Sequence, residues 1–269
     1  MMFMDEELAQ RLELAEAHVG FETARAMAEF RPDINAEALQ VAGGAAVYCG
    51  VGSPLTQALG LGMHGRVADS EIAEMEEFFR SRGAVSRVVI CPFVDSSLLA
   101  ALNQRGYLAV EFENTLARSL DNYEPSVAAY PVEVRKVDKE DFDTWGRTVA
   151  QGFVGDEEPP PVLKDYGGLM SCFRDAVCFL ALIDGEPAGG ASLSFHDDVA
   201  ALAGAGTLTM FRNRGVQTAL LRARLDFARS RGSRLAMVST RPGTVSQRNV
   251  ERLGFRIAYT RTAFHREWS

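Results

Sequence analysis

A basic loop followed directly by an amphipathic helix is the part of the sequence whose residue types can do chemistry. Arg212-Asn213-Arg214-Gly215 follows an apolar run typical of a strand, and apolar residues then recur at helical spacing from Val216 to Phe227. The first N–H groups of a helix lack intrahelical partners, and the helix dipole favours an anion there. Two arginines beside a glycine at this point predict a pyrophosphate site. An ordinary turn with solvated arginines would account for the same residues.

The pattern Arg212-x-x-Gly215-x-Gln217 resembles the pyrophosphate loop of the GNAT superfamily of acyl-CoA N-acyltransferases, Gln/Arg-x-x-Gly-x-Gly/Ala. The surrounding order of elements matches as well, with a preceding strand, a long helix, a strand over 235–239 and a last helix that ends in Leu253-Gly254-Phe255. The resemblance covers nearly all of residues 130–269. It implies an N-acetyltransferase that uses acetyl-CoA as co-substrate and moves the acetyl group directly to an amine.

The resemblance also implies which residues hold the cofactor. In the family, backbone groups of the preceding strand pair with the pantetheine arm, loop N–H groups hold the pyrophosphate, and a polar residue of the last helix contacts the cofactor. The corresponding positions here are Ala205, Gly206, Thr207, Leu208, Arg212, Arg214, Gly215, Val216, Gln217, Thr218 and Asn249. A backbone N–H near Thr207 could also stabilise the oxyanion of the transition state.

Two positions depart from the family's pattern. Gln217 stands where the motif has a small residue. Many members carry a tyrosine in the last helix, four residues before the glycine of the Gly-Phe pair, as general acid for the leaving thiolate, and here that position is Val250. Ser246, Tyr259 or a water would have to substitute, or the thiolate leaves without help. His196 is a candidate base. The catalytic residues therefore stay unassigned.

An acidic segment lies where related enzymes place a loop over the acceptor. Asp156, Glu157 and Glu158 precede three consecutive prolines. Their carboxylates could attract a cationic amine, and a solvated acidic loop would explain the same charges.

The sequence repeats a pattern of elements. Residues 80–83 and 229–232 are both Arg-Ser-Arg-Gly, and each copy ends a helical pattern. An apolar run, a second helical stretch, a Gly-aromatic pair and an alternating strand follow in both copies. The polar segment 119–125 ends in proline and is the expected linker. The sequence thus predicts two α/β domains of similar build in tandem, at 1–122 and 130–269, and the resemblance implies the mixed-sheet GNAT fold for both.

The first copy lacks the cofactor loop. Shifting back by the repeat offset of 149 (229 minus 80) places the motif on residues 63–68, where neither its arginine nor its glycine is matched. Asp69 and Glu71 open the next helix and would repel a phosphate there. We expect a degenerate N-terminal domain and one cofactor site, in the second domain. Within that second domain, Asp184-Gly185 between two apolar runs predicts a β-hairpin.

Composition excludes several classes. Hydrophobic residues make up 47% and charged residues 24%, as in a globular protein. A net charge of −8 argues against nucleic-acid binding, and no stretch approaches the roughly 18 apolar residues of a membrane span. Four scattered cysteines suggest neither a metal site nor a disulfide framework. The start lacks the pattern of a signal peptide, so we expect a cytoplasmic protein.

Alternatives from other classes remain. The chain could be a non-catalytic acyl-CoA binding module or sensor, or an interaction protein in which both copies are degenerate. The partner expected of an enzyme is a small-molecule or peptide amine. An exposed strand edge could join two copies into a homodimer, although no residue decides this.

Overall fold

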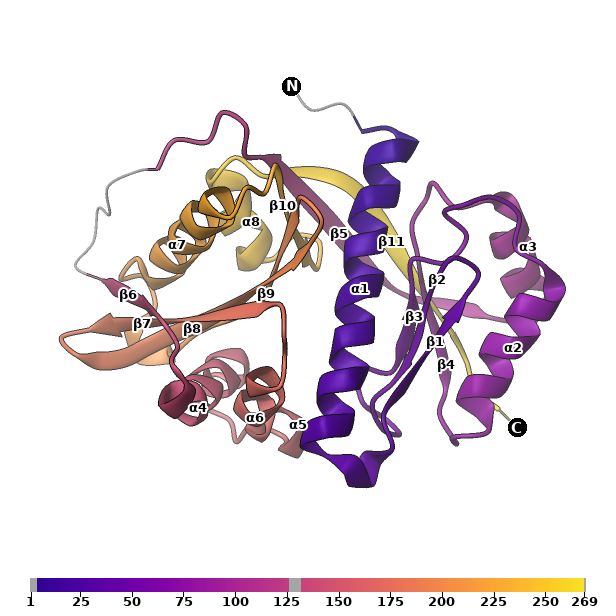
Figure 1. The fold of residues 1–269 in the computed structure, drawn as a ribbon, viewed down its shortest axis with the longest axis horizontal. Coiled ribbons are helices and arrows are strands. Elements are labelled where there is room, and N and C mark those ends of the chain that lie inside the picture. Colours follow the sequence, from indigo (N-terminus) through magenta and orange to yellow (C-terminus); the bar gives the residue numbers. More distant parts are fainter. Residues whose placement is uncertain (1–3, 126–131, 269) are drawn as a thin grey trace. The chain divides into compact units, whose positions relative to one another are not determined.

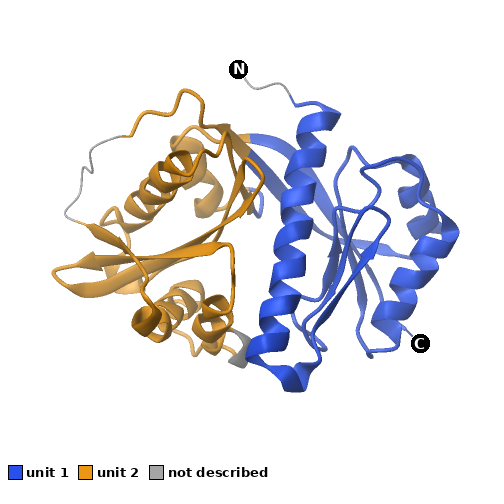
Figure 2. Ribbon diagram, in the orientation of Figure 1, with its two compact units in different colours: residues 1–116, 240–242, 257–269 blue, residues 117–239, 243–256 orange. Residues whose placement is uncertain are grey.

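The chain folds as two compact units, which Figure 2 shows in different colours. The computed structural model describes residues 4–125 and 132–268. Unit 1 comprises residues 1–116, 240–242 and 257–269, and unit 2 comprises residues 117–239 and 243–256. The expected domains at 1–122 and 130–269 follow the two sequence copies. The compact units differ from that division because two C-terminal segments group with unit 1.

Unit 1 contains a long N-terminal helix, six strands and two further helices (Figure 1). Its elements are α1 (Glu6–Phe30), η1 (Pro32–Ile34), β1 (Glu37–Val41), β2 (Gly44–Tyr48), β3 (Gln57–Leu59), α2 (Asp69–Arg80), β4 (Ser86–Ile90), α3 (Ser96–Gln104) and most of β5 (Leu108–Ser119) and β11 (Arg256–Arg266). Asp5 caps helix α1, because its carboxylate accepts the Leu8 N–H at 2.9 Å.

The sheet of unit 1 includes one strand from the end of the chain. Its strand order is β1-β2-β3-β4-β11-β5. Strands β3 and β4 are parallel, whereas β11 pairs with β4 in antiparallel register from Thr262↔Ile90 to Arg266↔Ser86. The sheet is therefore mixed, and its fifth strand belongs by sequence to the second copy.

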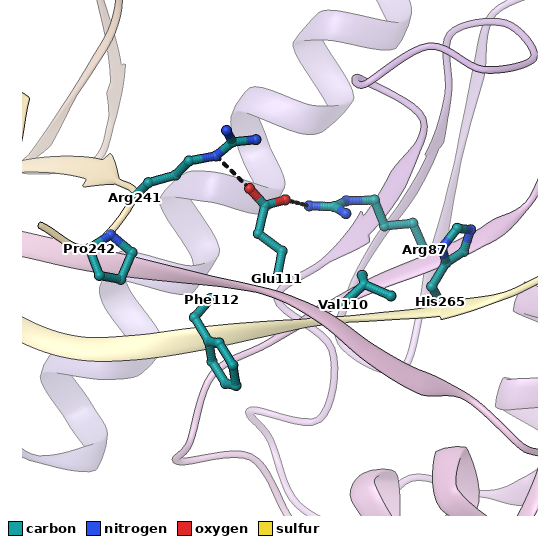
Figure 3. A pocket seen from close by; sticks show the side chains of 7 residues that line it. All are labelled: Arg87, Val110, Glu111, Phe112, Arg241, Pro242 and His265. Carbon is teal, nitrogen blue, oxygen red and sulfur yellow. Dashed lines mark hydrogen bonds and ion pairs between the residues drawn. The ribbon is translucent and has the colours of Figure 1, made fainter. Parts of the chain in front are cut away.

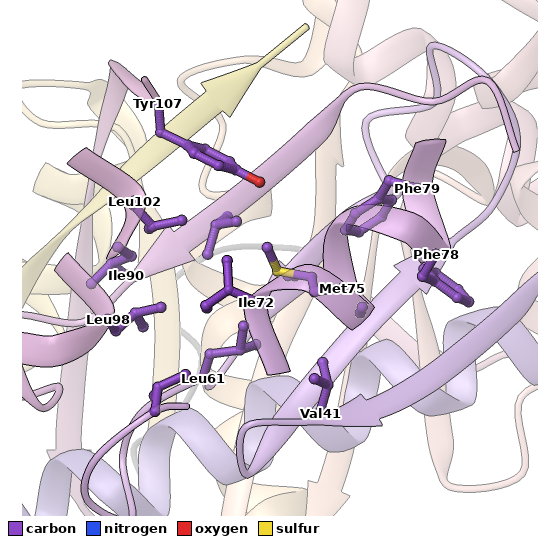
Figure 4. Close-up of a cluster of buried hydrophobic side chains, with 14 of the residues drawn as sticks. Val41, Leu61, Ile72, Met75, Phe78, Phe79, Ile90, Leu98, Leu102 and Tyr107 are labelled. Carbon is purple, nitrogen blue, oxygen red and sulfur yellow. The ribbon is translucent and has the colours of Figure 1, made fainter. Parts of the chain in front are cut away.

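The core of unit 1 forms where α2 and α3 pack on the sheet (Figure 4). Ile72, Met75 and Phe79 of α2 and Leu98 and Leu102 of α3 are all fully buried. Burying each such side chain contributes about 1.5–3 kcal/mol. These contacts hold both helices on the sheet without a bound ligand.

The strands of unit 2 also run in mixed directions, and helices pack on them. Its elements are β6 (Glu133–Lys136), η2 (Lys139–Asp141), α4 (Phe142–Val154), α5 (Pro161–Lys164), α6 (Tyr166–Ser171), β7 (Ala176–Ile183), β8 (Glu186–His196), β9 (Val199–Thr207), η3 (Thr209–Phe211), α7 (Val216–Ser230), β10 (Leu235–Thr240) and α8 (Val245–Arg252). The strand order is β10-β9-β8-β7-β6, with β10 parallel to β9 and the other neighbours antiparallel.

The predicted hairpin and repeat are both present. Asp184 (φ 53°) and Gly185 (φ 82°) form the turn between β7 and β8, and both left-handed residues suit a tight hairpin. The order α2-β4-α3-β5 recurs as α7-β10-α8-β11. Gly83 and Gly232 follow the first helix of each copy with positive φ, as a helix C-terminus favours. No helix in the described ranges is long and apolar enough to cross a membrane.

Candidate functional site

Strand β9 extends beyond its pairing with β10. The parallel register runs from Leu235↔Val199 to Val238↔Leu202. On its other edge, β9 stays paired with β8 as far as Gly189↔Thr207. Within the part of the chain that the structure describes, the backbone groups along this edge of residues 203–207 are therefore not paired with β10. An extended ligand can pair with such an edge.

A β-bulge lies within this same stretch of β9. Ser192 pairs with Ala203 and Gly190 with Gly206, so β9 carries one extra residue there. Gly204 has φ +55°, and a Cβ on it would lie 2.4 Å from the Tyr166 hydroxyl oxygen. Burial raises the pKa of Tyr166 to about 12, so its hydroxyl stays protonated at neutral pH. The bulge thus needs a glycine on both conformational and steric grounds.

Arg224 of α7 places a buried positive charge against the bulge. Its guanidinium donates to the carbonyl oxygens of Ser192 at 3.1 Å and Ala203 at 3.3 Å. The side chain is 1% exposed, and burial lowers its pKa to about 9, which leaves it protonated at neutral pH. These bonds fix two carbonyl groups that flank the extra residue. The charge also raises the electrostatic potential of the bulge.

Glycines let helix α4 and strand β8 approach the end of β9 closely. A Cβ on Gly152 would lie 2.6 Å from the Thr207 amide nitrogen, and one on Gly206 would lie 2.6 Å from the Val149 carbonyl oxygen. A Cβ on Gly189 would lie 2.7 Å from the Gly206 carbonyl oxygen. Distances under 3.0 Å exclude a side chain, so these positions define where β9 ends.

Thr207 carries a buried polar atom without a partner. Its Oγ1 is almost completely buried, and it has no hydrogen-bond partner among the described residues. An unsatisfied buried hydroxyl costs about 1–3 kcal/mol. Such atoms are rare in folded proteins and are typical of places where a ligand supplies the missing partner.

The loop after β9 leads to a helix start that no side chain caps. Turn η3 ends at Phe211, which is buried, and Gly215 then adopts φ 84° as N-cap of α7. Gly215 has no side chain that could accept from the first N–H groups. Among the described residues, no side chain caps the start of α7. The first turn, Val216 to Thr218, therefore keeps N–H groups for an anion.

The two predicted arginines lie exposed beside this helix start. Arg212 Nη2 donates to the Gly152 carbonyl oxygen at 3.5 Å, the outer limit of a hydrogen bond. Arg214 lies 3.9 Å from Asp184, which is itself 92% exposed, and its guanidinium stacks over the Phe211 ring. These contacts are weak in water, so little opposes turning both guanidiniums toward an anion.

Helix α8 carries the predicted residues of the last helix. Thr244 caps it by accepting the Gln247 N–H at 3.3 Å. Asn249 is half-buried and Ser246 is exposed. Val250 is 2% exposed, so it packs in the core of unit 2.

The other two candidate catalytic residues belong to other elements. His196 ends β8, four residues beyond Ser192 at the near side of the bulge, or roughly 13 Å along the strand. Tyr259 belongs to unit 1, where its hydroxyl donates to Glu13 Oε1 at 2.7 Å and burial raises its pKa. Neither residue belongs to β9, the basic loop or α7.

Sequence patterns missed several residues that shape this site. Gly152, Gly189, Gly204 and Arg224 carry no motif, because their importance comes from contacts across elements. The pair Gly189-Gly190 inside a strand was the one available signal, since glycines within strands often mark close backbone approach.

Comparison with known families decides the affiliation of this part of the chain. The model of the acetyltransferase (GNAT) family matches residues 140–255, from the turn before α4 to the end of α8. The C-terminal half of the chain is a GNAT domain. The match contains β9, the basic loop and α7, and it confirms the resemblance that the loop sequence suggested. No curated protein matches the chain.

Solved structures extend the GNAT fold to nearly the whole chain. A GCN5-related N-acetyltransferase from Kribbella flavida shares 16% identity and a TM-score of 0.68, over 94% of this chain and 96% of that one. A tandem GNAT protein from the clavulanic acid biosynthesis pathway shares 16% identity and a TM-score of 0.63, over 97% and 93%. A GCN5-related N-acetyltransferase from Sphaerobacter thermophilus shares 18% identity and a TM-score of 0.55, over 74% and 67%. The expected tandem GNAT fold is confirmed.

Proposed function

We propose that the chain is an acetyl-CoA-dependent N-acetyltransferase with one cofactor site, in unit 2. One observation carries the proposal. Strand β9 leaves its pairing with β10 and leads, through a loop with two exposed arginines, to the uncapped start of α7. The unpaired edge of β9 suits an extended thioester arm, and the uncapped helix start with its arginines suits a pyrophosphate.

The cofactor residues are those expected from the sequence. Backbone groups from Ala205 to Leu208 would pair with the pantetheine arm, and the Thr207 hydroxyl would gain its missing partner. Arg212, Arg214 and the N–H groups from Gly215 to Thr218 would hold the pyrophosphate, with Asn249 contacting the cofactor from α8. Bound acetyl-CoA would supply the reactive thioester.

The protein's own contribution to the reaction is positioning and charge. Backbone N–H groups in the bulge near Thr207 would stabilise the oxyanion, and the buried Arg224 charge would strengthen this effect in a poorly solvated site. Holding the amine against the thioester can account for about 7–11 kcal/mol of the barrier. Direct transfer needs no nucleophilic cysteine, and burial raises the pKa of the Cys178 thiol to about 12.

We expect no second site of this kind in unit 1. The equivalent helix, α2, begins at Asp69, and the Glu71 carboxylate accepts the Ala68 N–H at 2.7 Å. A carboxylate thus occupies the place of a phosphate. This supports the degenerate role expected for the first copy.

The acidic loop after α4 supports a cationic acceptor. Gln151 Nε2 donates to the carbonyl oxygens of Gly155 at 2.7 Å and Glu157 at 2.9 Å, which fixes the loop. Glu158 pairs with Lys164, so Asp156 and Glu157 carry the remaining negative charge. Both carboxylates are exposed. They favour an amine substrate that carries a further positive charge.

A non-catalytic acyl-CoA sensor is the second candidate, and one observation favours it. The position of the family's acid tyrosine holds the buried Val250. A sensor would bind acetyl-CoA as tightly as an enzyme would, but without turnover.

A turnover assay separates the two functions. Release of free thiol from acetyl-CoA is measured over a panel of neutral and cationic amines, with mass spectrometry of the products. The enzyme predicts an acetylated product, a preference for cationic amines and a raised KM for them in Glu157→Lys. Tight acetyl-CoA binding with no product across the panel would establish the sensor instead.

A further inference from the structure

A cavity on unit 1 collects positive charge in an otherwise acidic part of the molecule (Figure 3). It measures about 710 Å³ and is lined by Arg87, Val110, Glu111, Phe112, Arg241, Pro242 and His265. Unit 1 as a whole has 18 Asp and Glu residues against 11 Arg. Among the residues that line the cavity, two arginines stand against one carboxylate.

The two arginines reach the cavity from distant parts of the sequence and share one glutamate. Arg87 Nη2 donates a hydrogen bond to Glu111 Oε2 at 2.8 Å, and Arg241 Nε donates one to Glu111 Oε1 at 2.7 Å. Arg87 stands directly opposite His265 in the β4–β11 ladder, and its Nε also reaches Gln57 at 3.4 Å. The two guanidiniums and one carboxylate of the lining sum to a net positive charge, and the lining also includes an imidazole.

The remaining lining is apolar and open to solvent. Phe112 is 58% exposed and Val110 is 50% exposed, although both are large hydrophobic side chains. Pro242 adds a third apolar surface beside Arg241. Exposed apolar groups beside convergent polar groups are typical of small-molecule sites.

We propose that this cavity binds a small anion in which a carboxylate or phosphate is attached to a flat apolar group. The oxyanion lies between Arg87 and Arg241, where guanidinium groups form charge-assisted bonds. The apolar group lies on Val110 and Pro242. Glu111 holds the two arginines in place and competes with the ligand for them. This site is independent of the acyl-CoA site proposed for unit 2.

Calorimetric titration of the full-length protein with inorganic phosphate, phenyl phosphate and benzoate tests the proposal. We expect phenyl phosphate to bind more tightly than inorganic phosphate, because only the former covers the apolar lining. Comparison with benzoate distinguishes a phosphate from a carboxylate ligand. No saturable binding of any probe at millimolar concentration, in the wild type and in Glu111→Gln, would overturn the proposal.

Variants separate a binding site from a structural ion cluster. Arg241→Ala should weaken phenyl phosphate binding about tenfold or more, and Arg241 is 74% exposed, so the fold should tolerate the change. Glu111→Gln should tighten binding about tenfold, because it removes the competing charge. Arg80→Ala is the matched control, since Arg80 pairs with Glu77 on unit 1 but does not line the cavity.

The same titration distinguishes this cavity from the acyl-CoA site. The double variant Arg212→Ala, Arg214→Ala should bind phenyl phosphate as the wild type does. Binding that survives Arg241→Ala and disappears in the double variant would place the anion at the α7 start and overturn the proposal. A Glu111→Gln variant that folds but binds no better than wild type would show that the cluster is only structural.

Discussion

Thr207 is the residue of the candidate site whose hydroxyl the fold leaves without a hydrogen-bond partner. This oxygen is buried at the end of the strand that leads to the basic loop. The unpaired hydroxyl costs free energy in folding, and a ligand along β9 would supply its partner. Removing the hydroxyl should therefore favour folding but weaken ligand binding, so one substitution can test both effects.

Replacing Thr207 with valine should leave the free energy of unfolding unchanged or raise it, because the unsatisfied hydroxyl disappears while the shape is kept. Acetyl-CoA affinity should fall by about 2–12-fold, the equivalent of one neutral hydrogen bond of about 0.5–1.5 kcal/mol. Denaturant unfolding and calorimetry measure the two quantities. A clear loss of stability with unchanged affinity would show that the hydroxyl serves the fold.

Glu13 makes the stability of unit 1 depend on pH. The carboxyl is 1% exposed, accepts from the Tyr259 hydroxyl at 2.7 Å and lies 3.9 Å from Arg261, yet burial raises its pKa above the ordinary 4.5. Folded Glu13 therefore holds its proton more tightly than unfolded Glu13. The resulting stability is complete below pH 4.5 and is lost as the pH rises through the raised pKa.

Glu13→Gln removes this titration and keeps a neutral acceptor for Tyr259. The free energy of unfolding of the wild type, relative to the variant, should be lower at about pH 8 than at about pH 5, by about 1.4 kcal/mol for each unit of pKa shift between these limits. Urea unfolding at both pH values measures the difference. A wild type that gains stability relative to the variant as the pH rises would contradict the assignment.

At this scale the sequence identifies residues that belong to a motif and misses residues that act through contacts. Arg212, Arg214 and Gly215 stand out because they match the family's motif directly before a helix. Arg224 has no such signal, since an arginine in an amphipathic helix is usually solvated. Only the bulge of β9 makes it a buried donor.

The close packing of α4 on β9 is the element-scale feature that positions the loop. Gly152 sits where a Cβ would lie 2.6 Å from one backbone atom of β9 and 2.7 Å from another. Backbone atoms cannot move aside as a flexible side chain can. The helix therefore determines where the strand ends and the basic loop begins.

Gly152→Ala should displace α4 from β9. We expect a net loss of about 1–3 kcal/mol in unfolding free energy from the steric overlap, despite a gain of about 1 kcal/mol in helix propensity, and weaker acetyl-CoA binding. Arg147→Ala, on the exposed face of the same helix, is the control and should change stability by less than about 0.5 kcal/mol. A Gly152→Ala variant more stable than wild type would contradict the packing.

Local signals predicted the elements, and contacts between elements set their details. The Asp184-Gly185 hairpin follows from two residues that tolerate positive φ. The helix–strand–helix–strand repeat follows from periodicity and glycine-ended helices. The bulge at Gly204 needs the register against β8, which no local pattern contains.

At the scale of the whole chain, the last strand belongs to the first compact unit. Strand β11 pairs with β4, and Ala263 packs with Leu59 and Val89 in one buried cluster. The repeat predicted the strand itself but could not name its partner, because strand pairing depends on contacts distant in sequence. A division at the linker therefore separates β4 from its neighbour.

A fragment of residues 1–122 should not fold as a stable monomer, because β4 would expose an unpaired edge. Joining residues 257–269 to its end through a flexible linker should restore cooperative thermal unfolding. Circular dichroism and size-exclusion chromatography of both fragments provide the measurement. Cooperative unfolding of the monomeric 1–122 fragment alone would contradict the role of β11.

The most direct test of the central claim is calorimetric titration of acetyl-CoA into the wild type and into the double variant Arg212→Ala, Arg214→Ala. Two lost charge-assisted contacts should cost on the order of 2–4 kcal/mol, a loss in affinity of roughly 30- to 1,000-fold. The control is Arg31→Ala, Arg80→Ala, which removes two exposed ion pairs of unit 1. Saturable wild-type binding that collapses only in the first variant is the predicted result. No binding to the wild type, or equal binding to both variants, would contradict a cofactor site at the start of α7.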